Sequence, residues 1–216
     1  MKRFIQTIKN IWSIEDLRKR ILYTLGLVLI YRIGSFVVLP GVDPSQLAGL
    51  QKQGEEGLMG LLNMFSGGAF SNASIFALGI MPYITASIII QLFTMVIPKF
   101  QKLQRDGENG RKKMNQYTRF LTIIVCAFQA PAYITNMRTQ LGASSTAFYP
   151  FDGSAPTLFF WITSIIILIC GTLFVMWLGE RITEKGIGNG ISLLIMVGII
   201  ARLPFALIAE FGSRLN

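Results

Sequence analysis

The amino-acid sequence predicts an all-α, polytopic membrane protein with five membrane-crossing helices. Hydrophobic residues make up 52% of the 216 residues and charged residues only 14%, whereas soluble domains carry roughly 25% charged residues. Five stretches are apolar over about the 20 residues that a helix needs to cross a bilayer. Basic residues gather in alternate connections between these stretches, as they do in proteins that cross a membrane several times.

The predicted spans cover residues 21–39, 75–97, 120–137, 157–178 and 187–209. Ahead of the first span, residues 1–20 mix charged side chains with apolar ones that recur mostly three or four positions apart. This spacing indicates an amphipathic helix on the membrane surface. The alternative for this segment is a plain cytoplasmic leader.

The distribution of charge predicts the orientation. Fifteen of the 20 lysine and arginine residues lie in the 1–20 segment, the 98–119 loop and the 179–186 turn. The opposite segments, 40–74, 138–156 and 210–216, hold only Lys52, Arg138 and Arg214. Because basic residues stay in the cytoplasm, the N-terminus is expected there and residue 216 on the external side.

The 40–74 segment contains a second apolar part, residues 58–74, that is too short and too rich in glycine to span a bilayer. It is either a re-entrant half-helix or an outer loop packed on the helical bundle. Backbone at membrane depth is tolerated only where protein or a water-filled cavity surrounds it.

The residue types argue against catalysis. The sequence has no histidine, and the second to fifth spans have no Asp or Glu between their ends. Cys126 and Cys170 lie in apolar runs, where packing is a better explanation than a disulfide or a metal site. Residues 185–190 have the wrong spacing for a phosphate loop. They are expected to form a flexible turn, with Asn189 and Ser192 available as helix caps.

Isoleucines recur at helical spacing in two spans, as Ile80 and Ile84 and as Ile191 and Ile195. Such residues usually pack or face lipid, but a ring of them around a water path would gate it by dewetting. Gly79 and Pro82 together are expected to kink or loosen the helix of the second span.

The polar residues of the spans are mild, and most are expected to join helices at about 1 kcal/mol or less each. Gln129 lies in the middle of the third span, so we expect it to face another helix or an aqueous cavity. The basic 101–119 loop is either an anchor of topology or a docking surface for an acidic or nucleic-acid partner.

Several motifs together point to one family. In chain order they are Arg32-Ile-Gly-Ser-Phe36 with Pro40-Gly41, Asn63-Met-Phe-Ser-Gly-Gly68, Ala77-Leu-Gly-Ile-Met-Pro-Tyr-Ile84 with Ala86-Ser-Ile-Ile-Ile-Gln91, Gly107-Glu-Asn-Gly-Arg-Lys112 with Gln116-Tyr-Thr-Arg119, Trp177-Leu-Gly-Glu-Arg-Ile-Thr-Glu184 and Gly186-Ile-Gly-Asn-Gly-Ile-Ser192. This ordered set covers nearly the whole chain and resembles the SecY family of bacterial protein-conducting channels.

The resemblance implies roles for individual residues. Ile80, Ile84, Ile191 and Ile195 would supply four positions of a hydrophobic pore ring. The 58–74 segment would be the plug that blocks the outer funnel, with the core motif Asn63, Met64, Phe65, Ser66, Gly67 and Gly68. The second and third spans would form one side of a lateral gate, where Thr85 and Gln129 match the family's polar cluster.

The resemblance also implies a passive pore that has no cofactor, no metal and no catalysis, in the bacterial cytoplasmic membrane. Its substrates would be signal sequences and nascent polypeptides, and its neighbours would be membrane lipids and the SecE and SecG subunits. The SecA motor or the ribosome would dock at the basic loop without nucleic-acid specificity, through Lys102, Arg105, Arg111, Lys112 and Lys113.

The family has ten spans in two pseudo-symmetric halves, of which this chain matches the first five. We therefore expect that residues 1–216 alone do not make a sealed, gated channel. The competing hypothesis is half of a solute transporter with broken helices and inverted repeats. That hypothesis requires polar or charged side chains at the midplane, where these spans offer only Gln, Ser and Thr.

Overall fold

The computed structural model describes residues 12–47, 60, 63–141, 146–150 and 157–215. The elements are α2 (Glu15–Gly34), the 3₁₀ helix η1 (Pro44–Gln46), α5 (Met81–Val96), α6 (Pro98–Arg105), α7 (Gly107–Leu141), α8 (Leu158–Lys185) and α9 (Gly190–Leu215). The described residues pair in β-fashion only at two isolated bridges, Val38 with Ser74 and Val42 with Phe148. The predicted all-α class is confirmed. Most of the predicted surface helix, residues 1–11, lies outside the described residues.

Two of the described helices, α7 and α8, are long and apolar enough to cross a membrane. A third crossing results if α5 and α6 count as one span, but the two helices are bent by 101° at their junction. The first turns of α2 hold five charged residues: Glu15, Asp16, Arg18, Lys19 and Arg20. The structure thus supports a helical membrane protein, while the number of five spans stays a prediction.

The start of the second span differs from its prediction. Residues 66–80 form turns and no helix, and α5 begins at Met81. Pro82 therefore lies in the first turn of α5 and does not kink a longer helix. Proline lacks a main-chain N–H, and in the first turn of a helix that N–H would have no acceptor within the helix. Gly79, at φ +53°, supports the turn just before it.

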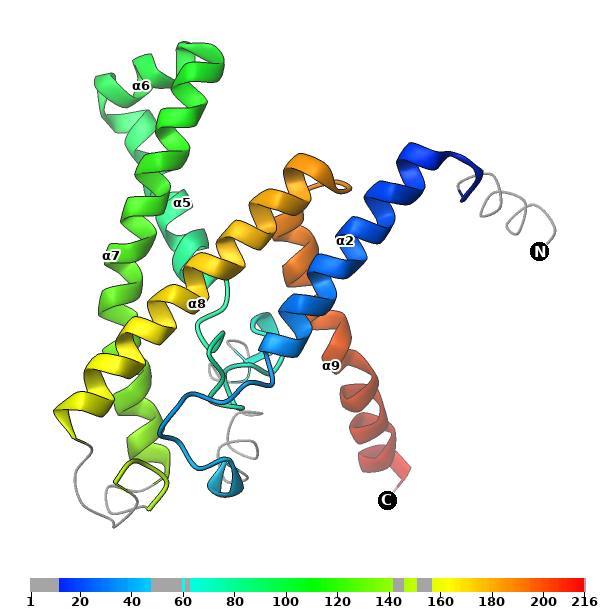
Figure 1. Ribbon diagram of the computed structural model, residues 1–216, viewed down its shortest axis with the longest axis vertical. Coiled ribbons are helices and arrows are strands. Elements are labelled where there is room, and N and C mark those ends of the chain that lie inside the picture. Colours follow the sequence, from blue (N-terminus) through cyan, green and yellow to red (C-terminus); the bar gives the residue numbers. More distant parts are fainter. Residues whose placement is uncertain (1–11, 48–59, 61–62, 142–145, 151–156, 216) are drawn as a thin grey trace.

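The basic 98–119 loop is helical, contrary to the prediction. It forms α6 and the first turns of α7, which together make a hairpin at the top of Figure 1. Gly107, at φ +66°, reverses the chain between the two helices. Glu108 pairs with Lys112 at 3.0 Å, four residues along α7, a spacing that stabilises helices. The predicted 179–186 turn is also largely helical, because α8 continues to Lys185.

The core consists of two apolar clusters around α8. The first lies between α7 and α8 and includes Cys126, Ile134 and Leu168. The second joins α2, α8 and α9 to the turns before α5 and includes Tyr31 and Leu194. Figure 1 shows α8 crossing the middle of the molecule, with α7 on one side and α2 and α9 on the other.

Candidate functional site

The 58–74 segment is described at residue 60 and from residue 63 onward. Residues 60 and 63–65 are helical and residues 66–73 form turns, so its described part is not helical throughout. Asn63 is completely buried. The side-chain Oδ1 of Asn63 accepts a hydrogen bond from the main-chain N–H of Ser71 at 3.1 Å. Its main-chain carbonyl accepts one from the N–H of Gly68 at 2.9 Å. One buried side chain therefore closes the turn.

Two glycines let this turn approach α9. Gly67 has φ +64° and Gly68 has φ +93°, a region that favours glycine because it lacks a Cβ. A Cβ on Gly67 would lie 3.0 Å from the Cα of Gly198 in α9. The segment and α9 therefore come into close contact at Gly67 and Gly198.

The end of α2 holds the other side of the segment. The hydroxyl of Tyr31 donates to the carbonyl of Ser66 at 3.4 Å, and Nη1 of Arg32 donates to the carbonyl of Gly67 at 2.7 Å. The Arg32 guanidinium also lies over the ring of Phe36, 5.0 Å from its centroid. Sequence reasoning assigned neither Tyr31 nor Arg32 to the site. An arginine within an apolar helix was the available signal, since such a charge needs a partner.

The four isoleucines of the predicted ring come together. Ile80 is a buried member of the second core cluster, and Ile84, Ile191 and Ile195 are half-buried against the same cluster. Ile80 precedes α5, but its carbonyl accepts the hydrogen bond from the N–H of Ile84 at 3.0 Å. The two pairs, 107 or more residues apart in sequence, therefore line one apolar region beside the 58–74 segment.

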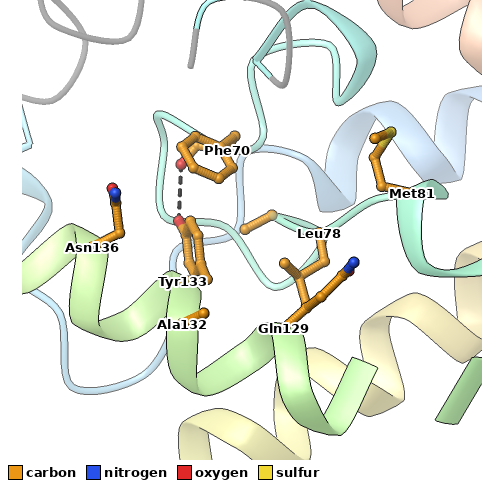
Figure 2. Close-up of a pocket in the computed structure, with 8 residues that line it drawn as sticks. Phe70, Leu78, Met81, Gln129, Ala132, Tyr133 and Asn136 are labelled. Carbon is orange, nitrogen blue, oxygen red and sulfur yellow. Dashed lines mark hydrogen bonds between the residues drawn. The ribbon is translucent and has the colours of Figure 1, made fainter. Parts of the chain in front are cut away.

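The two predicted gate residues lie on neighbouring helices, α5 and α7. Gln129 lines a cavity of about 310 Å³ together with Met81, Tyr133 and Asn136 (Figure 2). The hydroxyl of Tyr133 donates to the carbonyl of Phe70 at 2.8 Å and so ties α7 to the turns. Thr85 lies one turn beyond Met81, outside the lining residues, and donates to the Met81 carbonyl at 3.1 Å. Gln129 was expected to face another helix or an aqueous cavity, and the structure places it at this cavity.

The five basic residues predicted to face a partner are all exposed on the α6–α7 hairpin: Lys102, Arg105, Arg111, Lys112 and Lys113. Further along α7, Arg119 forms a two-pronged ion pair with Glu180 of α8, with 3.1 Å between Nε and Oε1. The hairpin is thereby attached to α8 at its base.

Asn189 and Ser192 were predicted as possible caps of the turn between α8 and α9, and the structure shows Asn189 in that role. Oδ1 of Asn189 accepts from the N–H groups of Ile191 and Ser192, at 3.1 and 3.3 Å. Ser192 thus donates its N–H to that cap and does not provide it. The hydroxyl of Thr24, on α2, accepts from the N–H of Ile187 at 3.2 Å, which joins α2 to the turn.

Comparison with known proteins identifies the family of the chain. The SecY family model matches residues 74–215. Proteins named "Protein translocase subunit SecY" are 47% identical in Escherichia coli K12, 46% in Haemophilus influenzae and 44% in Pseudomonas aeruginosa. The matches cover 90%, 89% and 93% of this chain, but 43%, 42% and 43% of those relatives. The chain therefore spans less than half the length of these three relatives, and it belongs to the SecY family.

Proposed function

We propose that this chain forms the N-terminal half of the central channel subunit of a bacterial protein translocase. The channel would pass unfolded secretory polypeptides across the cytoplasmic membrane and release transmembrane segments sideways into it. The observation that carries the proposal is the convergence of Ile80, Ile84, Ile191 and Ile195 on one apolar cluster beside the 58–74 segment. The printed name of the relatives, a protein translocase subunit, supports it.

An apolar constriction suits a pore for polypeptides. A translocating chain presents every kind of side chain, so specific recognition would stall it. Branched apolar side chains make no directional bonds, and a narrow ring of them excludes water and ions when no chain is present. The channel would have no catalytic chemistry of its own, and the energy for movement would come from a motor or from protein synthesis.

The neighbouring elements would provide the moving parts. The 58–74 segment would be the plug, since its described residues meet α2 through the hydrogen bonds of Tyr31 and Arg32 and meet α9 at Gly67. The facing surfaces of α5 and α7, with Thr85 and Gln129, would be one side of the lateral gate. The remaining half of the ring and of the gate would come from the C-terminal half of the channel.

The α6–α7 hairpin would be the cytoplasmic docking surface. Its exposed lysines and arginines favour partners with a negative surface, by long-range electrostatic attraction. A motor such as SecA or the ribosome would dock there, and SecE and SecG would be the companion subunits. In this arrangement the N-terminus is cytoplasmic and residue 216 external.

Photo-crosslinking tests the proposed pore. The chain is fused to the C-terminal half of its Escherichia coli relative, and a photoreactive amino acid replaces Ile84, Ile191 or, as control, Ile166. Ile166 is 54% exposed on α8, away from both clusters. With a stalled secretory chain we expect adducts from positions 84 and 191 and none from 166. A competent channel without adducts at 84 and 191 would contradict the pore assignment.

A further inference from the structure

Arg32 lies at a place where a charge needs a specific partner. It is in the last turn of α2, half-buried, with its guanidinium over Phe36. No carboxylate among the residues that the structure describes pairs with it. Its hydrogen bond goes to a main-chain carbonyl instead, that of Gly67 at 2.7 Å.

The bond to Gly67 is both short and charge-assisted. Hydrogen bonds from an ionised donor are roughly twice as strong as neutral ones. Charged side chains at membrane depth are costly unless they have such partners. When the carbonyl of Gly67 moves away, Arg32 loses this acceptor.

The geometry around Gly67 is adapted to this bond. A Cβ at position 67 would lie 3.3 Å from Nη1 of Arg32 and 3.0 Å from the Cα of Gly198. A side chain there would therefore crowd the guanidinium and α9 at once. Tyr31 binds the preceding carbonyl, that of Ser66. Two consecutive residues of α2 thus hold two consecutive carbonyls of the segment.

We infer that Arg32 is a positioning residue that latches residues 63–74, the continuously described part of the segment, in their closed place and sets how readily they leave. The inference rests on the proposed function, in which this segment is the plug. Losing a hydrogen bond from a charged group shifts an equilibrium by at least about tenfold. Replacing Arg32 by leucine is therefore expected to increase the displaced population about tenfold or more.

Cysteine labelling measures this population. Ser71 is 1% exposed and its N–H is bound to Asn63, so Ser71→Cys reports when the turn opens. The host is the same fused channel in membranes, with Cys126→Ala and Cys170→Ser, and the probe is a water-soluble maleimide. In Arg32→Leu we expect the labelling rate to rise about tenfold. In Arg32→Lys, which keeps a charged donor, we expect a smaller rise.

Two controls separate a latch from a general loosening. Arg181 lies over Trp177 at 5.6 Å, as Arg32 lies over Phe36, but on α8; Arg181→Leu should leave the labelling rate unchanged. Native Cys126, 1% exposed between α7 and α8, should stay unlabelled in an Arg32→Leu protein that keeps it. Equal increases at Cys126 and at position 71 would overturn the latch.

The outcomes also distinguish the inference from the proposed function. If the fused channel translocates a signal-bearing precursor and Arg32→Leu labels at the parent rate, the latch is wrong and the proposed function stands. If the fused channel reaches the membrane without translocating, the proposed function fails. The labelling ratio between Arg32→Leu and parent then still decides whether Arg32 holds the segment.

Discussion

Arg119 of α7 and Glu180 of α8 form the one ion pair between different helices among the described residues, across 61 positions of sequence. Glu180 is the more buried partner, with 18% of its side chain exposed against 49% for Arg119. The pair attaches the start of the predicted third span to the end of the fourth. It joins α7 to α8 at the base of the basic hairpin.

Removing Arg119 should destabilise the contact between α7 and α8. Arg119→Ala leaves a largely buried carboxylate without its partner, and we expect a loss of about 1–2 kcal/mol in the free energy of unfolding. A double-mutant cycle with Glu180→Gln, followed by unfolding in mixed micelles, should give a coupling of about 1 kcal/mol.

The exposed pair Arg181 and Glu184, 2.9 Å apart on α8, is the matched control for this cycle. Its coupling should be no more than about 0.5 kcal/mol, since solvent screens exposed pairs. Equal coupling energies for the two pairs would show that the Arg119–Glu180 pair stabilises the protein no more than an exposed pair does.

A methyl group on Gly171 should disturb the packing of the turns on α8. The added Cβ would collide with the carbonyl oxygen of Ile75, so the main chain has to move. We expect Gly171→Ala to cost about 1–3 kcal/mol in the same unfolding measurement.

Gly26 provides the opposite case in α2. A Cβ there meets no atom within 4 Å, and alanine is favoured over glycine in a helix by about 0.5–1 kcal/mol. Gly26→Ala should therefore be neutral or stabilising. If Gly171→Ala and Gly26→Ala change the free energy of unfolding equally, the close approach of Ile75 does not explain the glycine at position 171.

Loss of the Asn63 side chain should open the turn of the 58–74 segment locally. Asn63→Ala leaves the buried N–H of Ser71 without its 3.1 Å acceptor, at a cost of about 1–3 kcal/mol. Hydrogen exchange at Ser71 should accelerate by about tenfold to a hundredfold, with helix α7 unaffected.

Asn136→Ala is the comparison for this variant, because Asn136 Oδ1 accepts only from Gln140 on its own helix in the bonds described, at 2.7 Å. It should leave exchange at Ser71 as in the parent. Unchanged exchange in Asn63→Ala would show that the side-chain bond does not hold the turn.

Asp43 should make the start of η1 sensitive to acid. The N–H and the hydroxyl of Ser45 donate to its carboxylate at 2.9 and 2.8 Å, and these bonds lower the pKa of Asp43. A lowered pKa in the folded state means that the carboxylate stabilises the turn above the ordinary pKa of aspartate. That stabilisation is lost as the pH falls through the folded pKa.

Carbon NMR of the Asp43 carboxyl group checks this prediction, with a midpoint expected below that of an unstructured peptide. Asp43→Asn should remove the acid response of the Ser45 amide signal. A midpoint at the peptide value would mean that the Ser45 bonds do not persist in solution.

Local patterns in the sequence were sufficient for the helical class and for part of the site. Lipid imposes a minimum length and requires internal hydrogen bonding, so apolar composition alone predicts membrane helices such as α7 and α8. The family motifs led to the four isoleucines, which the structure brings to one cluster. The same local signals gave the wrong conformation for the α6–α7 hairpin, because its many charged residues were interpreted as a loop. They also began the second span too early, because Pro82 was interpreted as a kink inside a helix and not as part of its first turn.

The sequence by itself determined that this is a helical membrane protein of recognisable family character, because composition and short motifs are properties of the linear chain. Only the tertiary structure decided that Arg32 holds Gly67, 35 positions away, and that Arg119 holds Glu180. The sequence around Arg32 and Arg119 does not indicate which residue each of them binds. The partner depends on how α2 packs beside the turns and α7 beside α8, and packing is set by the whole fold.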